Sequence, residues 1–488
     1  IREKVLAHGQ RLLPVLYAGD AGRVAGVVTR TDILKLLQEE LAEKPGRVEK
    51  KRRLTSLMKE RLPGWALEIL REIGRTAEGL GFQSYVVGGF VRDLLLKREN
   101  LDMDVVIEGD GIKFAAKFAE GKGLKVRSHE RFKTAVVIFP DGIIRPAGFK
   151  LDVATARLEY YERPSALPTV ELSSLKLDLY RRDFTINTLA VALNPERFGE
   201  VVDFFSAQRD IKEKTIKVLH NLSFVEDPTR AFRAVRFAER FGFRMARHTL
   251  NLIKNTVKLD IIKKLSGPRL RDEMKNVLKE DAAAGAVKRL DELGLLKLIH
   301  PSLAWDERTE KLFERTREVL AWHRLLYTPD RVEEWLTLLL ALTDGLTEEE
   351  FAALGRRLSI VGKKRQAVVT GRSGSRKALK LIETGRVKTN GDLYELLHPL
   401  PLELLLYLMA GTEEEQVKKD LSNYVTHLRN VKVSLGGNDL KKLGVAEGPD
   451  MGEILGVLFR KKLNGEVETK KDEEEFVKEW LATIKGRA

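Results

Sequence analysis

Two acidic residues separated by one position, Asp102 and Asp104, are the first candidates for chemistry in this sequence. Residues two apart on a strand point to the same side, so the predicted strand 102–107 presents both carboxylates on one face. Two carboxylates held close together repel one another unless a cation lies between them. Because Mg²⁺ prefers oxygen ligands and binds through one or two carboxylates plus substrate phosphates, the pair predicts a magnesium site for phosphoryl or nucleotidyl transfer.

A glycine pair precedes these acids, where a predicted strand ends and a helix over 90–97 is predicted to begin. Gly88 and Gly89 leave backbone N–H groups uncovered at that point, and such groups bind phosphate. Arg92, one turn into the helix, can add a charge-assisted pair of hydrogen bonds to the same phosphate. A glycine pair alone more often only satisfies a positive φ, and an isolated D-x-D is more often a pair of exposed acids. Their combination favours a nucleotide site.

A carboxylate flanked by guanidinium groups, in Arg181-Arg182-Asp183, is the next candidate. The carboxylate can accept a hydrogen bond from a ribose hydroxyl while the arginines pair with phosphate. A surface cluster of ion pairs is the alternative.

Asp227 and Pro228 predict the start of a helix, as N-cap and first helical residue. At about 100° per residue, four arginines of this helix fall on roughly a third of its circumference. They are Arg230, Arg233, Arg236 and Arg240. A carboxylate at the helix start and an arginine one turn later offer an acceptor and a donor to the Watson–Crick edge of a base, and adenine and cytosine both suit such a pair. Solvated arginines are the alternative.

These segments, in this order, resemble the class II nucleotidyltransferases of the tRNA CCA-adding and bacterial poly(A) polymerase family. The glycine turn and the paired acids match its GG-x-V-R-D and D-x-D elements. Four later segments match its third catalytic strand, its sugar-recognition motif, its base-selecting motif and the element that follows. They are 152–157, 181–187, 226–230 and 266–270, so the resemblance covers roughly residues 83 to 280.

The resemblance implies a reaction in which the 3′ hydroxyl of an RNA attacks the α-phosphate of ATP, or possibly CTP, and pyrophosphate leaves. It implies Mg²⁺ as the cofactor, held by Asp102 and Asp104, with Asp152 as a third catalytic acid that not every branch keeps. It also implies a set of nucleotide contacts. They are Gly88, Gly89, Arg92, Arg182, Asp183, Asp227, Arg230, Arg233 and Arg236.

The RNA substrate is expected to be tRNA, because the chain lacks a long arginine-rich tail of the poly(A) branch. Addition of A alone and addition of all of CCA both stay open at this point. A poly(A) polymerase acting on general RNA is one alternative, and a non-catalytic, adenylate-sensing RNA-binding protein is another.

The fold class that follows is α+β, with a small mixed-sheet head followed by an all-helical neck, body and tail. The pattern of periodicity and charge predicts six parts. They are a partial CBS-like segment (1–45), a charged linker (46–62), the catalytic head (63–218), a nucleotide-selecting neck (219–282), a helical body (283–430) and an RNA-binding tail (431–488).

In the CBS-like segment the residue pattern predicts strands over 12–17 and 24–29, a turn over 18–22 and a helix over 31–41. It resembles the second half of a CBS module, whose ligand contacts would fall on Thr29 and Asp32. Because such motifs work in pairs, a remnant without a ligand is the favoured interpretation.

The charge balance supports an RNA partner, since 86 Lys and Arg against 72 Asp and Glu leave +14 over 488 residues. Seven basic residues of the predicted body form a candidate track for RNA phosphates. They are Lys363, Lys364, Arg365, Arg372, Arg376, Lys377 and Lys380. The absence of cysteine excludes disulfides and thiolate metal sites and fits a cytoplasmic protein. No apolar run reaches the ~20 residues of a membrane span, so no membrane partner is expected. The sequence carries no signal for an oligomeric state.

Overall fold

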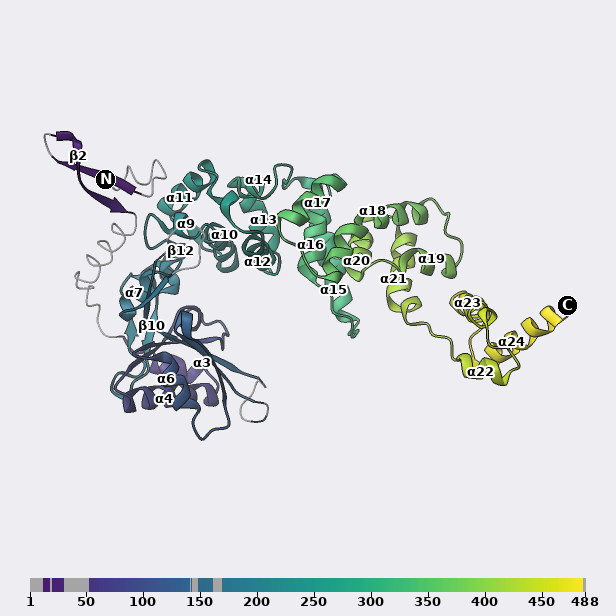
Figure 1. Ribbon diagram of the computed structural model, residues 1–488, viewed down its shortest axis with the longest axis horizontal. Coiled ribbons are helices and arrows are strands. Elements are labelled where there is room, and N and C mark those ends of the chain that lie inside the picture. Colours follow the sequence, from purple (N-terminus) through teal and green to yellow (C-terminus); the bar gives the residue numbers. More distant parts are fainter. Residues whose placement is uncertain are drawn as a thin grey trace. The chain divides into compact units, whose positions relative to one another are not determined.

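The computed structural model describes residues 12–17, 20–29, 52–140, 142, 148–160 and 169–485. The chain divides into two compact units, Ile1–Leu265 and Ser266–Ala488 (Figure 1). All strands lie in the first unit, and between residues 266 and 485, which the structure describes throughout, every regular element is a helix. The predicted α+β class with a helical continuation is confirmed. The division between the units falls inside the predicted neck, and the six-part organisation stays a prediction.

A seven-stranded mixed sheet, the head sheet, forms the centre of the first unit, with the strand order β11-β10-β3-β4-β7-β6-β5. In chain order its strands are β3 (Gln83–Val87), β4 (Met103–Glu108), β5 (Lys125–His129), β6 (Thr134–Ile138), β7 (Lys150–Thr155), β10 (Ala190–Ala192) and β11 (Val201–Val202). Only β4 and β7 run parallel, and the other neighbours are antiparallel. Because β4 is a central strand, its acids do not lie on a sheet edge.

Both faces of β4 are covered. Met103 and Val105 are buried on one face, and Val106 packs on the other with Leu175 and Leu179 of α7 (Leu175–Tyr180). This alternation follows from the period of two along a strand, and it places Asp104 on the same face as α7. The segment that follows α7 therefore starts beside Asp104.

Helices of the first unit cover the head sheet and continue beyond it. They are α3 (Thr55–Arg61), α4 (Gly64–Gly79), α5 (Gly89–Leu95), α6 (Gly111–Ala119), α7, α8 (Ala207–Lys212), α9 (Ser223–Glu226), α10 (Thr229–Phe241) and α11 (Arg247–Lys258). α4 and α6 contact each other and strands of the sheet, as Figure 1 shows near its lower left. α3 lies inside the predicted charged linker, where the burial of Leu54 and Met58 fixes the chain in spite of its charges.

Several sequence-predicted elements differ from the observed ones. The strand predicted over 24–29 begins earlier, because β2 (Asp20–Thr29) pairs antiparallel with β1 (Leu12–Tyr17) along most of its length. β5, β10 and β11 were not predicted, since they are short or carry mainly polar residues. The predicted helix 31–41, with Asp32, lies outside the described residues.

The second unit consists of packed helices. They are α12 (Gly267–Leu278), α13 (Ala283–Glu292), α14 (Leu295–Ile299), α15 (Glu307–Leu325), α16 (Glu334–Leu342), α17 (Glu348–Arg357), α18 (Lys363–Glu383), α19 (Asn390–Leu397), α20 (Leu402–Gly411), α21 (Glu415–Thr426), α22 (Gly437–Lys442), α23 (Pro449–Leu463) and α24 (Lys470–Lys485). α16 and α20 form its core, because almost every residue of both is buried. Within the described residues no single helix has the length and apolarity of a membrane span, although α19 and α20 meet both requirements as a pair bent by 116°.

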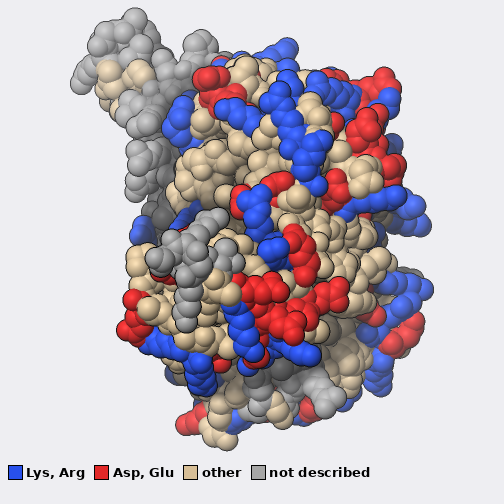
Figure 2. Space-filling view, turned by 90° about the vertical axis from the view of Figure 1, so that its right-hand side faces the viewer, with Lys and Arg blue, Asp and Glu red and all other residues tan. Residues whose placement is uncertain are grey.

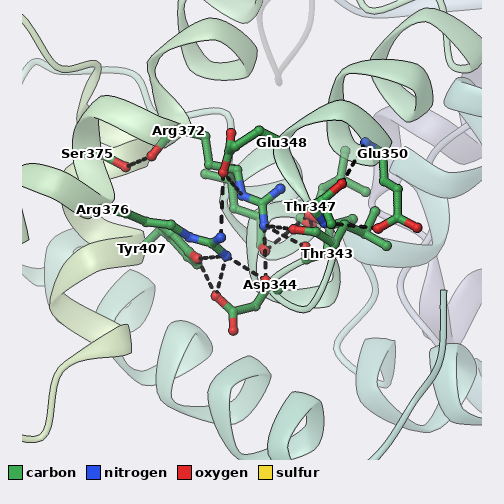
Figure 3. A network of polar contacts seen from close by, with 12 residues as sticks. Thr343, Asp344, Thr347, Glu348, Glu350, Arg372, Ser375, Arg376 and Tyr407 are labelled. Atoms are coloured by element: carbon green, nitrogen blue, oxygen red, sulfur yellow. Dashed lines mark hydrogen bonds and ion pairs between the residues drawn. The ribbon is translucent and has the colours of Figure 1, made fainter. Parts of the chain in front are cut away.

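A buried polar network joins α18 to the turn that follows α16 (Figure 3). Arg372 is 0% exposed, and its Nη2 donates to the carbonyl oxygens of Thr343, Asp344 and Leu346 at 2.9–3.0 Å. The guanidinium also lies 4.4 Å from the centre of the Phe351 ring. The predicted role of Arg372 in a surface track for RNA is therefore wrong, because its side chain is buried and its Nη2 is bonded inside the helical core.

Candidate active site

Asp104 lies between the glycine turn and Asp152. In the antiparallel pair of β3 and β4, Val87 stands opposite Asp104, so Gly88 follows directly beside this acid. In the parallel pair of β4 and β7, Asp104 stands opposite Asp152, and paired residues of neighbouring strands point to the same face. Asp102 precedes β4 and is exposed. The sheet register therefore brings the three predicted catalytic acids to one end of two neighbouring strands.

The electrostatics of these acids favour a bound cation. Burial, with the charges of Asp102 and Asp152 and against the opposing effect of Arg182, raises the pKa of Asp104 to about 6. Burial and the charge of Asp102 also raise the pKa of Asp152. A raised pKa means that the negative charge is unfavourable where it stands, and a cation relieves that cost.

The donor set fits a hard divalent ion, because it offers carboxylate oxygens and no sulfur or imidazole. Among the residues that the structure describes, no three metal-ligating side chains converge into a complete cage. An ion that keeps several waters and takes further ligands from substrate phosphates needs no such cage. Asp102 and Asp104 are the residues that would hold it, with Asp152 beside them.

Gly88 and Arg182 are in close contact beside Asp104. Gly88 has φ +72°, and a Cβ built there would lie 2.5 Å from Nη1 of Arg182. Any larger residue would therefore displace this guanidinium and strain the backbone. Arg182 forms an ion pair of 3.5 Å with Asp178, while its buried Nε has no hydrogen-bond partner. A buried donor without a partner is costly, and a phosphate oxygen would satisfy it.

Arg92, predicted to contact phosphate, is 4% exposed and bonded within the protein. Its Nε and Nη2 each donate to Asp93 at 2.8 Å, and its Nη1 donates to Asn187 at 2.6 Å. The guanidinium also lies over the rings of Phe237 and Phe241, at 5.3 and 4.6 Å from their centres. This geometry holds the helix after the glycine turn against α10. Direct contact with a nucleotide stays a prediction.

Asp183 and Arg233, predicted as separate nucleotide contacts, are paired with each other. The carboxylate accepts from Nε and Nη2 of Arg233 at 2.9 and 2.6 Å, and from Nδ2 of Asn187 at 2.8 Å. Burial alone would raise the pKa of Asp183, but Arg233 and Asn187 lower it to about 2. Asp183 is therefore a fixed, ionised acceptor at neutral pH.

The basic helix α10 begins at Thr229, later than predicted. Pro228 is its N-cap residue and Asp227 follows α9, yet Oδ1 of Asp227 still accepts from the backbone N–H of Thr229 at 3.1 Å. Arg230 donates to the hydroxyl of Ser223 at 2.8 Å and to the carbonyl of Arg181 at 2.7 Å. The helix thus joins the predicted base-selecting residues to the segment that carries Arg182.

The arginines of α10 do not form the solvated face that was the alternative. Arg230 and Arg236 are 5% and 9% exposed, Arg233 is half-buried, and only Arg240 is exposed. Arg236 lies 4.8 Å from the centre of the Phe237 ring. Burial of two guanidinium groups and partial burial of a third on one helix fit positioned side chains and argue against a solvated stripe.

Three polar residues were not assigned a role from the sequence. Asp93 and Asn187 lie within the family motifs, so their positions were marked in the sequence. Their residue types alone indicated no specific role. Asn100 carried no signal, since an asparagine in a short polar loop is common. Its Nδ2 donates to Asp93 at 2.7 Å, and its Oδ1 accepts from the backbone N–H of Asp102 at 2.8 Å.

The basic excess is not gathered into one patch on the face in Figure 2, where Lys and Arg side chains lie among Asp and Glu side chains. In the predicted basic track, Arg365 pairs with Glu333 at 2.9 Å and Arg376 with Asp344 at 2.9 Å. Lys363, Lys377 and Lys380 are exposed. The part of the track available to RNA is therefore smaller than predicted.

Comparison with known proteins places these motifs in a family. Residues 84–217 match the poly A polymerase head domain, and residues 242–306 match the probable RNA and SrmB-binding site of polymerase A. An A-adding tRNA nucleotidyltransferase of Geobacter sulfurreducens is 44% identical over 97% of this chain, which spans 54% of that protein. One of Halalkalibacterium halodurans is 31% identical over 88% of this chain and 96% of that protein.

Solved structures show the same likeness. The Thermotoga maritima CCA-adding enzyme, in a complex with tRNA, matches with a TM-score of 0.68 and 31% identity, over 90% of this chain and 100% of that one. The likeness thus extends through both units, while this chain spans only about half the length of the Geobacter protein.

Proposed function

Because the chain belongs to the family of tRNA nucleotidyltransferases and poly(A) polymerases, we propose that it transfers AMP from ATP to the 3′ end of tRNA and releases pyrophosphate. The observation that carries this proposal is the register of the head sheet. It sets Asp104 beside the glycine turn on one side and opposite Asp152 on the other. A phosphate-binding turn next to clustered acids is the arrangement that nucleotidyl transfer requires.

In this proposal the 3′ hydroxyl oxygen bonds to the α-phosphorus of ATP. The bond from that phosphorus to the oxygen that bridges to the β-phosphate breaks, pyrophosphate leaves with the electron pair, and the hydroxyl proton passes to water. We propose Mg²⁺, held by Asp102 and Asp104 with Asp152 nearby, as the cofactor. When bound, the ion would neutralise phosphate charge and lower the pKa of the hydroxyl.

The other predicted residues bind and orient the nucleotide. The backbone N–H of Gly89 and the buried Nε of Arg182 donate to phosphate oxygens, whereas the N–H of Gly88 already donates to the carbonyl of Leu189 at 2.9 Å. Arg92 holds the turn in place. Asp183, fixed by Arg233, accepts from a ribose hydroxyl, and this pairing keeps the carboxylate charged at neutral pH.

The base is selected at the start of α10 in this proposal. Asp227 and Arg230 face the Watson–Crick edge of adenine, and Arg236 supports the same surface from one to two turns further along. Addition of A alone is favoured over addition of CCA because the two similar proteins with 44% and 37% identity are A-adding enzymes. A tRNA substrate implies a cytoplasmic location.

The substrate is tested with three RNAs of similar length: tRNA that ends in CC, tRNA that lacks CCA entirely, and an unrelated RNA. Each is incubated with Mg²⁺ and either ATP or CTP, and the products are resolved at single-nucleotide length. We expect extension of the CC-ending tRNA with ATP and no reaction with CTP.

Other outcomes separate the alternatives. Extension of the tRNA without CCA by both nucleotides indicates a CCA-adding enzyme. Repeated adenylation of all three RNAs indicates a poly(A) polymerase. Binding of tRNA without any extension, under conditions in which the protein is folded, supports the non-catalytic alternative and overturns the proposal.

A further inference from the structure

We infer that Asn100 is a positioning residue that fixes the loop before Asp102, as the last link of a continuous hydrogen-bonded chain that starts at Asp183. This inference rests on the proposed function, because it assigns a role within the same site. In this inference the effect of Asn100 on the reaction passes through Asp93 and Asp102, the residues to which it is hydrogen-bonded.

The chain runs from the sugar-recognition segment to the metal-binding segment without a gap. Nδ2 of Asn187 donates to Asp183 at 2.8 Å, and Oδ1 of Asn187 accepts from Arg92 at 2.6 Å. Arg92 donates twice to Asp93 at 2.8 Å. Asn100 then donates to Asp93 at 2.7 Å and accepts from the backbone of Asp102 at 2.8 Å.

Burial makes this chain rigid along most of its length. Arg92, Asp93, Asn187 and Asp183 are 4%, 2%, 7% and 7% exposed. Buried polar groups exchange few hydrogen bonds with water, so each member is held by its neighbours. The chain becomes accessible only at its end, since Asn100 is half-buried and Asp102 is exposed.

Asn100 suits the last position because both ends of its amide are used. Oδ2 of the buried Asp93 accepts from Asn100 in addition to Nη2 of Arg92, and the backbone N–H of Asp102 donates to Oδ1 of Asn100. An aspartate at this position would place a second negative charge beside Asp93. An alanine would remove both hydrogen bonds, the one to Asp93 and the one from Asp102.

The loop that Asn100 closes is also anchored from the other side. Lys97 has φ +56°, a conformation that turns the chain sharply after α5. Arg98 donates from Nη2 to the carbonyl of Arg240 at 3.2 Å and lies 5.0 Å from the centre of the Phe241 ring. α10 therefore holds the middle of the loop, and Asn100 fixes the end at which the metal-binding segment begins.

The test uses the Asn100→Ala and Asn187→Ala variants, their combination, and Asn430→Ala as a matched control on an exposed asparagine of the second unit. The readouts are Mn²⁺ affinity of the RNA-free protein by electron paramagnetic resonance, kcat and KM for ATP with CC-ending tRNA, and the urea unfolding midpoint. For Asn100→Ala we expect Mn²⁺ affinity to fall about 10-fold and kcat about 10- to 100-fold, as for residues that support metal ligands. KM for ATP should stay within about 2-fold of the wild-type value. The unfolding midpoint should equal that of the wild type within the measurement error.

The combined variant tests whether the two asparagines act through one chain. Its loss in kcat should be at least about 2-fold smaller than the product of the two single losses, because either substitution interrupts the same connection. Mn²⁺ affinity and kcat within 2-fold of wild type in Asn100→Ala would overturn the inference. If that variant does not fold, Asn100→Ser is measured against the same limits. Failure of the proposed function is distinguishable, because then the wild type itself adds no AMP to any RNA.

Discussion

Arg92 in the head and Arg372 in the helical body are both buried, yet their hydrogen bonds lead to different places. Arg92 pairs with the carboxylate of Asp93, and the bonds continue through Asn100 to the exposed Asp102. Arg372 donates to backbone carbonyls that end a helix, and its Nε and Nη1 have no hydrogen-bond partner. Burial lowers the pKa of Arg372. The buried charge of Arg372 thus fixes a turn, whereas the buried charge of Arg92 belongs to a network that reaches the candidate site.

Burial alone therefore does not identify a functional arginine. The network of Arg372 runs through Asp344 to Arg376 and Tyr407, as Figure 3 shows, and Asp344 also pairs with the exposed Arg308. The network of Arg92 ends at Asp102, which is exposed. If the comparison holds, substitutions in the body lower stability without altering catalysis. Substitutions at the exposed end of the head network, at Asp102, lower catalysis without lowering stability.

The largest effect is expected at the exposed end of the head network. Asp102→Ala combined with Asp104→Ala removes the proposed metal ligands, and AMP incorporation should fall at least about 10³-fold, or about 4 kcal/mol of transition-state stabilisation. Filter binding should show unchanged affinity for tRNA. Glu60→Ala with Glu78→Ala, two exposed acids of the first unit, is the control. Incorporation at the wild-type rate would remove the acids from the mechanism.

A large loss of stability is expected in the body. Arg372→Met removes the donor of three carbonyl groups, and the free energy of unfolding should fall by about 3 kcal/mol. Urea unfolding measures the loss, and Arg386→Met, on an exposed side chain of the same unit, is the control. The kcat of the folded fraction should match the wild type. A reduced kcat at unchanged stability would break the contrast between the two regions.

A smaller effect of opposite sign is expected for Asp104→Asn. The pKa of Asp104 is raised from 3.8 to about 6, so its ionisation costs stability as the pH rises through that window. Without divalent cations, the variant should be more stable than the wild type by about 2 kcal/mol at pH 7 to 8, after a discount for partial exposure. The difference should vanish below about pH 4. A less stable variant at pH 7 would show that the acid is not strained in the free protein.

The smallest effect is expected for Tyr407→Phe. The phenol donates to Oδ1 of Asp344 at 2.5 Å, and Arg376 donates to the same oxygen, so the carboxylate keeps a partner in the variant. The free energy of unfolding should fall by about 1 kcal/mol in a urea titration. Tyr327→Phe, at an 88% exposed position, should change it by less than half of that. Equal losses at both positions would remove the phenol from the network.

The α+β class, the glycine turn and the position of the paired acids at a strand could be predicted from the sequence, because strand alternation and glycine spacing are local signals. It did not reveal that Asp183 and Arg233 pair with each other, since 50 residues separate them and only the packing of α10 brings them together. Arg372 was assigned to the surface because a charged residue in a helix normally faces water. Its burial depends on carbonyl groups of a distant turn, which no local pattern encodes. The catalytic and binding roles of the site residues stay predictions.

The most direct test of the account is the length of the product when tRNA ending in CC is incubated with ATP and Mg²⁺. The account predicts that the wild-type chain adds a single AMP and that the Asp102→Ala, Asp104→Ala variant adds none while still binding the tRNA. A wild-type chain that leaves this tRNA unchanged, or a variant that extends it as the wild type does, would contradict the account.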